Sequence, residues 1–304
     1  MGIKDTSEKM LEDYNDVFAD IINVLVFNGQ RIIKENELET SSLSNFYKHE
    51  NKNNVMERDV GKYWKGHNIK ISLFGLENQT NIDNNMPIRI MCYDSAAYRK
   101  QLDKKAQKEK YPVITLVLYM GWKTEWTNNL KLSDCLKIDN TLKPLLGKFI
   151  HDYEINVINV AWLTDEQIEM FTSDFKILAK QLRNLRIEGK PIMTNDEITH
   201  AFEMLGLMKA LTNDNIYENM QAFTEPNNIA KEGANTMTSI YTLTLQQTAE
   251  KAAEKKTKEI AFRMKENGIA ITDIAKMTNC NINMLKKWFE EVPASQTYPE
   301  KQPA

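Results

Sequence analysis

Cysteine is scarce in this chain of 304 residues, and its three members lie far apart. Cys92, Cys135 and Cys280 form no C-x-x-C pair, which argues against a disulfide framework and against a thiolate zinc site. The four histidines are equally dispersed, so no His-rich metal centre is indicated. A reducing compartment is therefore expected.

Long apolar runs are also missing. No run approaches the ~20 residues that a membrane-spanning helix requires. The first residues lack the basic-then-apolar pattern of a secretory signal. We therefore expect a cytoplasmic protein that does not enter a membrane.

A strong net charge is the third absence, because 39 basic and 42 acidic residues give a formal charge of -3. The overall charge gives no support to nucleic-acid binding. Lysines do gather at residues 100–110 and 251–258, but both runs also contain acidic residues, as solvated helix faces do. Nucleic-acid binding through a local patch stays open.

Residues 1–190 have the pattern of a mixed α/β domain. The predicted elements are a helix at 8–28, a hairpin at 57–64 and 69–77, a helix at 86–107, strands at 111–120 and 155–163, and a helix at 165–186 capped by Thr164. The polar stretch 30–54 is predicted to be irregular. A helix between two strands implies a right-handed crossover and parallel pairing.

After Gly189 the pattern changes to helices alone. They are predicted at 195–211, 213–222, 244–265, 271–277 and 282–290. The predicted organisation is an α/β domain at 1–190, a helical extension at 191–235, a charged helix with a small helix pair at 236–294, and a loose tail at 295–304.

Two acidic clusters flank the predicted hairpin. Alternation along its second strand puts Glu77 and Gln79 on one face. Asp59 joins that face only if the hairpin loop has an odd number of residues, because a one-residue slip turns every side chain over. Carboxylate and amide oxygens suit a hard cation such as Mg²⁺, and Arg89 at the start of the next helix suits a phosphate. Alone, Glu77 is an ordinary solvated carboxylate, and the tail repeats the Glu-x-Gln pattern at residues 300–302.

Several short motifs occur here in a fixed order. They are Phe18-Ala19-Asp20, Arg58-Asp59-Val60, Glu77-Asn78-Gln79-Thr80, Met86-Pro87-Ile88-Arg89-Ile90-Met91 and Tyr93-Asp94. This set resembles the recombination-promoting nuclease / putative transposase family, which belongs to the PD-(D/E)XK nuclease superfamily. The resemblance implies a restriction-endonuclease-like αβββαβ core, with a mixed sheet flanked by helices, followed by an all-helical C-terminal region.

The same resemblance implies a metal-dependent DNA endonuclease and a role for each matching residue. Asp59 and Glu77 would hold the metal, Asn78 would add its backbone carbonyl, and Gln79 stands where the superfamily has its catalytic Lys. Asp20 matches an acidic position that would assist a second ion. The implied cofactor is Mg²⁺, with Mn²⁺ or Ca²⁺ as alternatives, and the implied partner is DNA.

The segment 271–289 resembles a helix-turn-helix, in which Asn279 or Cys280 replaces the usual turn glycine. Lys286 and Lys287 would contact phosphate. Such helix pairs also serve as helical caps or dimer contacts. Two alternatives to the nuclease therefore stand: a catalytically weak or inactive DNA-binding protein that uses this unit, and a scaffold or homodimer formed through the helix at 244–265.

Overall fold

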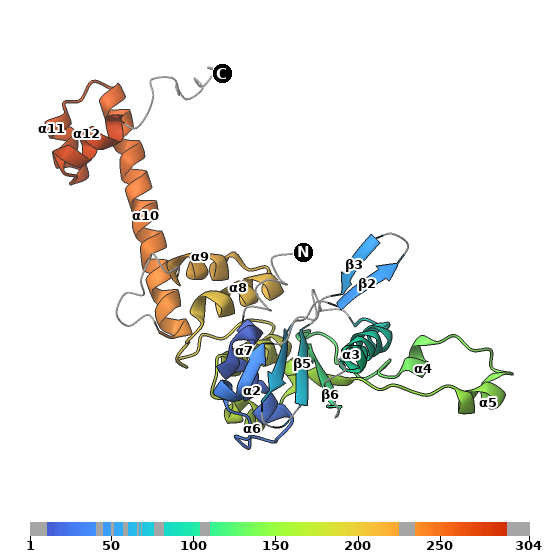
Figure 1. Cartoon of the computed structure of the whole chain (residues 1–304). Helices are drawn as coiled ribbons and strands as arrows, with labels where there is room; N and C mark the ends of the chain where they lie inside the picture. Colours follow the sequence, from blue (N-terminus) through green and yellow to red (C-terminus); the bar gives the residue numbers. More distant parts are fainter. Residues whose placement is uncertain are drawn as a thin grey trace. The chain divides into compact units, whose positions relative to one another are not determined.

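The computed structural model describes residues 11–40, 45–49, 52–56, 60–65, 67, 69–75, 82–103, 110–224 and 235–290. The chain divides into two compact units, residues 1–241 and 242–304. The first combines helices with strands, and the described part of the second is helical (Figure 1). The predicted mixed α/β class with a helical C-terminal region is confirmed, whereas the restriction-endonuclease-like core stays a prediction.

A five-stranded sheet with the order β1-β4-β5-β6-β7 forms the centre of the first unit. Its strands are β1 Leu38–Thr40, β4 Val60–Trp64, β5 Ile69–Gly75, β6 Val113–Tyr119 and β7 Asn156–Asn159. The first three are antiparallel, and β5, β6 and β7 are parallel. The hairpin and the parallel pairing were both predicted from sequence, and both are confirmed.

The stretch 30–54 is not irregular as predicted. It contains β1 and the strand β2 Asn45–His49, and it ends within β3 Lys52–Met56, which pairs with β2 in a separate two-stranded sheet. Their polar sequences lack the apolar alternation by which a half-buried strand is recognised. The prediction failed for that reason.

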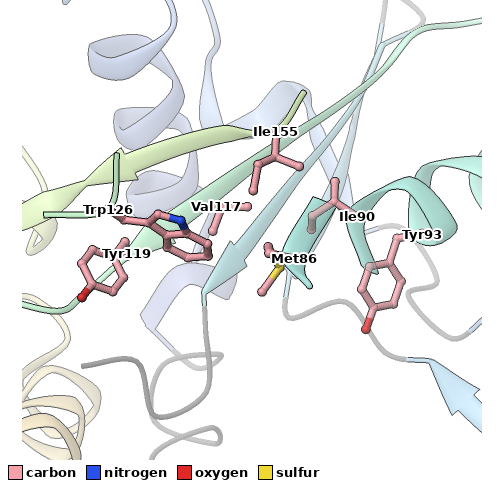
Figure 2. Close-up of a cluster of buried hydrophobic side chains, with 7 residues drawn as sticks. All are labelled: Met86, Ile90, Tyr93, Val117, Tyr119, Trp126 and Ile155. Atoms are coloured by element: carbon pink, nitrogen blue, oxygen red, sulfur yellow. The ribbon is translucent and has the colours of Figure 1, made fainter. Parts of the chain in front are cut away.

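Helix α3 Met86–Asp103 connects β5 to β6 and covers one face of the sheet. Figure 2 shows the cluster that joins them: Met86, Ile90 and Tyr93 from α3, Val117 and Tyr119 from β6, with Trp126 and Ile155. All seven side chains are buried, so their apolar surface is removed from water. Met86, Ile90 and Tyr93 therefore pack α3 on the sheet.

The other face lies against α2 Asn15–Leu25. Within the helix predicted at 8–28, residues 11–13 are also helical, Val26 ends α2, and residues 8–10 lie outside the described residues. Lys62 of β4 is buried on this side, 1% exposed. Its Nζ donates to the carbonyl and the Oδ1 of Asp13, both at 2.7 Å, and to Thr40 Oγ1 at 3.2 Å. An ammonium group has three donors, so the charge is buried with every donor used.

Two helices replace the single one predicted at 165–186. They are α6 Asp165–Met170 and α7 Phe175–Glu188. Thr164 caps α6 as predicted, because its hydroxyl accepts from the backbone N–H of Gln167 at 3.2 Å. The predicted strand at 155–163 is also shorter, since β7 ends at Asn159 and a 3-10 turn, η3 Val160–Trp162, follows.

The remaining helices agree with the predicted set apart from their ends. They are α8 Ala201–Thr212, α9 Asn215–Thr224, α10 Met237–Glu266, α11 Ile271–Thr278 and α12 Ile282–Glu290. Between β6 and β7 lie the short helices α4 Leu132–Cys135 and α5 Lys143–Leu146 and the turn η2 Gly147–Phe149. Within the described residues, no helix has the length and apolarity to cross a membrane.

Candidate functional site

The predicted catalytic residues Asp59, Glu77, Asn78 and Gln79 lie outside the described residues. The ladder between them is described, and Trp64 pairs with Ile69. Four residues, 65–68, therefore connect β4 to β5. The odd-length loop that sequence reasoning required is wrong for this ladder.

Arg89 lies in the first turn of α3, where its Nη1 donates to Asp83 Oδ2 at 2.8 Å. Asp83 also accepts from the N–H of Asn85 at 2.9 Å, so one carboxylate closes the turn before the helix and orients the arginine. Burial acts to lower the pKa of Arg89, but the hydrogen bond to Asp83 and the nearby Tyr93 outweigh it and raise the pKa. The side chain is 39% exposed, so an anion from solvent can reach it.

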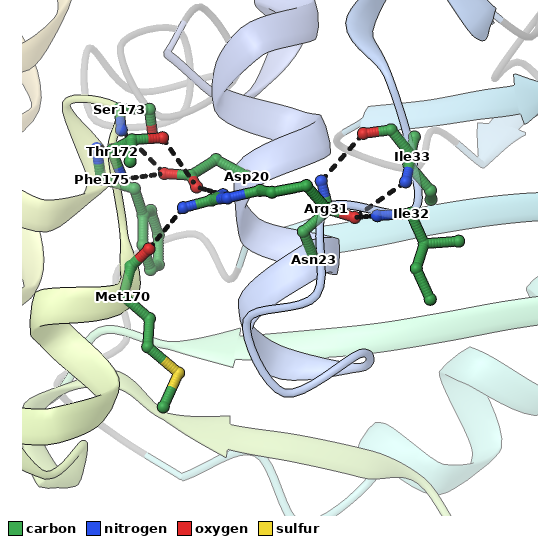
Figure 3. A network of polar contacts seen from close by, with 9 residues as sticks. All are labelled: Asp20, Asn23, Arg31, Ile32, Ile33, Met170, Thr172, Ser173 and Phe175. Atoms are coloured by element: carbon green, nitrogen blue, oxygen red, sulfur yellow. Dashed lines mark hydrogen bonds and ion pairs between the residues drawn. The ribbon is translucent and has the colours of Figure 1, made fainter.

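Asp20 is buried on α2, where its carboxylate joins this helix by hydrogen bonds to the segment between α6 and α7 (Figure 3). Its Oδ1 accepts from Arg31 Nη1 and from the Thr172 hydroxyl, and its Oδ2 accepts from the N–H groups of Thr172 and Ser173 at 2.8 and 2.7 Å. These four bonds occupy the four lone-pair positions of a carboxylate. No position is left for an ion, so Asp20 is not in the metal set proposed below.

The break between α6 and α7 explains why those N–H groups are available. In a continuous helix they would bond to carbonyls one turn earlier, whereas here they point at Asp20. Arg31 completes the junction, because its Nη2 donates to the carbonyl of Met170 at 2.5 Å. The polar contacts of α2 therefore hold a loop 152 residues further along the chain.

Asn23, one turn after Asp20, holds the backbone of Ile32 and Ile33 against α2 by hydrogen bonds. Its side-chain oxygen accepts from the N–H groups of Ile32 and Ile33 at 3.0 and 2.8 Å, and its Nδ2 donates to the Ile33 carbonyl at 2.8 Å (Figure 3). Sequence reasoning assigned Asn23 no role. The signal was available, because a polar residue stood among apolar ones on a predicted buried face.

Asp94 lies on α3 and holds this helix on its own face of the sheet. It is buried, its Oδ1 accepts from the Thr115 hydroxyl of β6 at 2.7 Å, and its Oδ2 accepts from the Tyr153 hydroxyl. Tyr93 beside it packs in the apolar cluster. Both residues of the Tyr93-Asp94 motif are thus engaged in holding the helix on the sheet.

Trp126 follows β6 and is an anchor of its loop. It is 1% exposed, its N–H donates to Asn159 Oδ1 at 2.7 Å, and Asn159 Nδ2 donates back to its carbonyl at 3.1 Å. The indole Nε1 donates to the Asn128 carbonyl at 2.8 Å. Burial and these three hydrogen bonds make Trp126 a structural anchor of the loop.

In the second unit, α11 and α12 pack with α10 around a small core of Ala261, Ile274, Leu285 and Trp288. Asn279 ends α11 in the left-handed conformation, with φ 53°, and so takes the place of the turn glycine. Lys286 and Lys287 are exposed, as phosphate contacts require. The predicted helix pair is confirmed, and its DNA binding stays a prediction.

Metal ligands are not clustered in the part of the chain that the structure describes. There, no group of three or more His, Cys, Asp or Glu side chains could hold an ion. The described cysteines are free thiols.

These features define an α/β protein with a β-α-β crossover, a partly exposed arginine at the start of the crossover helix, and a helical C-terminal unit. Residues 71–213, a little under half of the chain, match the model of the family described as "Putative transposase, YhgA-like". Over this range the resemblance to the putative transposase / recombination-promoting nuclease family is confirmed. The matched range contains Glu77, Gln79 and Arg89, but not Asp20, Asp59 or the C-terminal lysines. No curated protein and no solved structure matches the chain.

Proposed function

We propose that this protein is a metal-dependent DNA endonuclease that hydrolyses phosphodiester bonds. The observation that carries the proposal is the transposase-family match, because one matched segment contains Glu77, Gln79 and Arg89. Transposases act on DNA, and phosphodiester hydrolysis needs positioning and charge stabilisation more than covalent chemistry. A carboxylate, an amide and an arginine supply both.

The strand arrangement supports placing Asp59 in the same site. Strands β4 and β5 are antiparallel, with Val60 opposite Leu73. The first residue of β4 and the last residues of β5 therefore lie at the same edge of the sheet. Extended without change, however, this register would turn positions 59 and 77 to opposite faces. The proposal thus requires a one-residue bulge beyond the described ladder, a device common at sheet edges and beside active sites.

The proposed donors fit magnesium. Asp59 and Glu77 provide carboxylates and Asn78 a backbone carbonyl, the hard oxygens that Mg²⁺ prefers, and Mn²⁺ or Ca²⁺ would use the same set. When bound, the ion would lower the pKa of a water molecule and stabilise charge on the phosphate. Gln79 would accept a hydrogen bond from the attacking water, and Arg89 would hold the phosphate backbone.

Plasmid nicking tests the proposal. Supercoiled DNA is incubated with Mg²⁺ and the wild type, Glu77→Ala, or the exposed control Glu188→Ala. We expect Glu77→Ala to lose at least about a hundredfold in rate, as a metal ligand should, and the control to keep its activity. Equal nicking by the wild type and Glu77→Ala would refute the assignment.

A second candidate function is DNA binding by the α11–α12 pair without vigorous cleavage. The observation that favours it is the exposure of Lys286 and Lys287 on a helix that follows an Asn279 turn. Changing both lysines to Gln should then weaken DNA binding and flatten its salt dependence by about two units of slope. Unchanged affinity would leave this unit a structural or dimer contact.

A further inference from the structure

Residues 130–154, between β6 and β7, form an arm that extends away from the sheet and α3 (Figure 1). Its two limbs are joined at the base, where the N–H of Leu132 donates to the Tyr153 carbonyl at 2.8 Å and that of Ile155 to the Leu130 carbonyl at 3.0 Å. An isolated antiparallel bridge pairs Lys131 with Glu154. The arm is thus an ordered extension whose base is held together by backbone hydrogen bonds.

The tip of the arm, residues 136–149, is apolar and exposed. Leu145 is 64% and Phe149 69% exposed, and Leu136, Leu142 and Leu146 are exposed as well. The tip is nevertheless ordered, since Asp139 Oδ1 accepts from the Thr141 N–H at 2.8 Å, and α5 and η2 follow. Large apolar side chains presented together on an ordered element mark an interaction surface.

The charge of the tip indicates the kind of partner. Three lysines, Lys137, Lys143 and Lys148, stand against one acid, Asp139, for a net charge of +2 in a chain whose total is -3. Among the described residues none of the three lysines has an ion-pair partner, and all are exposed. Two tips pressed together would bring like charges into contact. A polyanion fits the surface better than a second tip does.

The root of the arm lies beside the candidate phosphate site. Asn129 Nδ2 donates to Asn84 Oδ1 at 2.8 Å, and Cys135 Sγ donates to the Asn84 carbonyl at 3.1 Å. Asn84 adjoins Asp83, which orients Arg89. The arm is therefore fixed to the turn from which Arg89 reaches solvent.

We propose that the tip of the arm is a DNA-binding wedge. Leu145 and Phe149 insert against base steps in the minor groove, while Lys143 and Lys148 contact the flanking phosphates. Apolar wedges beside basic side chains are a general means of gripping and bending duplex DNA. The inference rests on the proposed function, because the substrate that it grips is the one the nuclease would cut.

The test measures the binding of full-length protein to a labelled duplex of about 30 bp in EDTA, from about 50 to 200 mM salt. Lys143→Gln/Lys148→Gln should bind roughly tenfold more weakly near 100 mM salt, with a salt slope lower by about two. The matched control Lys34→Gln/Lys190→Gln, two exposed lysines outside the arm, should match the wild type. Leu145→Ser/Phe149→Ser should keep the slope, lose affinity, and lose the bend measured by energy transfer between the duplex ends.

The outcomes separate the two proposals. If arm variants bind like the wild type while the wild type nicks DNA, the wedge is refuted and the nuclease stands. If binding depends on the arm but Glu77→Ala nicks as fast as the wild type, the nuclease assignment fails and the wedge stands. If the wild type binds no DNA, the wedge is refuted. A lower sedimenting mass for Leu145→Ser/Phe149→Ser would then identify a second copy as the occupant. The arm variants and the lysine control change exposed side chains, so unaltered circular dichroism is expected for them.

Discussion

Asp20 and Tyr217 are both buried polar side chains of the first unit, but their surroundings differ completely. Asp20 has all four lone-pair positions used by donors from two other segments. The hydroxyl of Tyr217, on α9, has no hydrogen-bond partner among the described residues. A buried polar group stabilises a fold only when it is satisfied. We therefore expect removal of the Asp20 carboxylate to lower the free energy of unfolding, and removal of the Tyr217 hydroxyl to raise it.

The largest expected change in the free energy of unfolding is that of Asp20→Ala. The change leaves the N–H groups of Thr172 and Ser173 without their acceptor and removes the ion pair with Arg31. We expect the free energy of unfolding to fall by about 3 kcal/mol, measured by chemical denaturation.

Asp139→Ala is the matched control. Asp139 also accepts from a backbone N–H and a hydroxyl, both of Thr141, but it is exposed. Its loss should cost less than about 1 kcal/mol. If both variants lost the same stability, burial would not be the reason for the difference.

Helix α2 also shows what the sequence could and could not predict. The spacing of Phe18, Ile21 and Ile22 predicted an amphipathic helix, and all three side chains are buried. Asp20 was expected to assist a metal, because a linear motif does not distinguish a metal ligand from a carboxylate that only accepts structural hydrogen bonds. Its donors lie 11, 152 and 153 residues away and could not be inferred without the fold.

The hairpin illustrates a second limit. Alternation and turn residues predicted both strands, and the turn was placed at residues 65–68, as the Trp64–Ile69 pairing requires. The number of loop residues decides the face of every flanking side chain. Sequence reasoning needed an odd number to unite Asp59 with Glu77, but nothing in a turn of Lys, Gly, His and Asn selects one register.

Changes at Lys62, a third buried polar side chain, are expected to have an effect on stability between those of Asp20→Ala and Tyr217→Phe. Lys62→Ala removes a buried four-carbon stem as well as three hydrogen bonds, so we expect a loss of about 2–3 kcal/mol. Lys62→Met keeps most of the stem and should lose about 1 kcal/mol, because the side chain of Asp13 is 56% exposed and regains water.

Lys65→Ala serves as the control for Lys62. Its ion pair with Glu39 joins two half-exposed side chains, so the cost should stay below about 0.5 kcal/mol. Equal losses for Lys62→Ala and Lys62→Met would show that the ammonium contacts, not the stem, hold the strand to α2. Thermal unfolding at neutral pH measures all three.

The smallest effect, with the opposite sign, is expected for Tyr217→Phe. Removing an unsatisfied buried hydroxyl should raise the free energy of unfolding by up to about 1 kcal/mol. Burial, with a smaller contribution from Asp214, raises the pKa of Tyr217 above its ordinary value. An unfolded tyrosine ionises near pH 10 while the folded one stays neutral, so wild-type stability should fall as pH rises above about 10.

The Tyr217→Phe variant should lose less stability over that alkaline range, and denaturation curves at neutral and alkaline pH measure the difference. Tyr14→Phe is the control, because the Tyr14 hydroxyl donates to Glu203 Oε1 at 2.9 Å and its removal should cost about 0.5 kcal/mol. A loss above about 1 kcal/mol for Tyr217→Phe would mean that the hydroxyl has a partner outside the described residues. Tyr217 would then resemble Asp20, as a buried polar group whose hydrogen bond stabilises the fold, and the two sites would no longer differ.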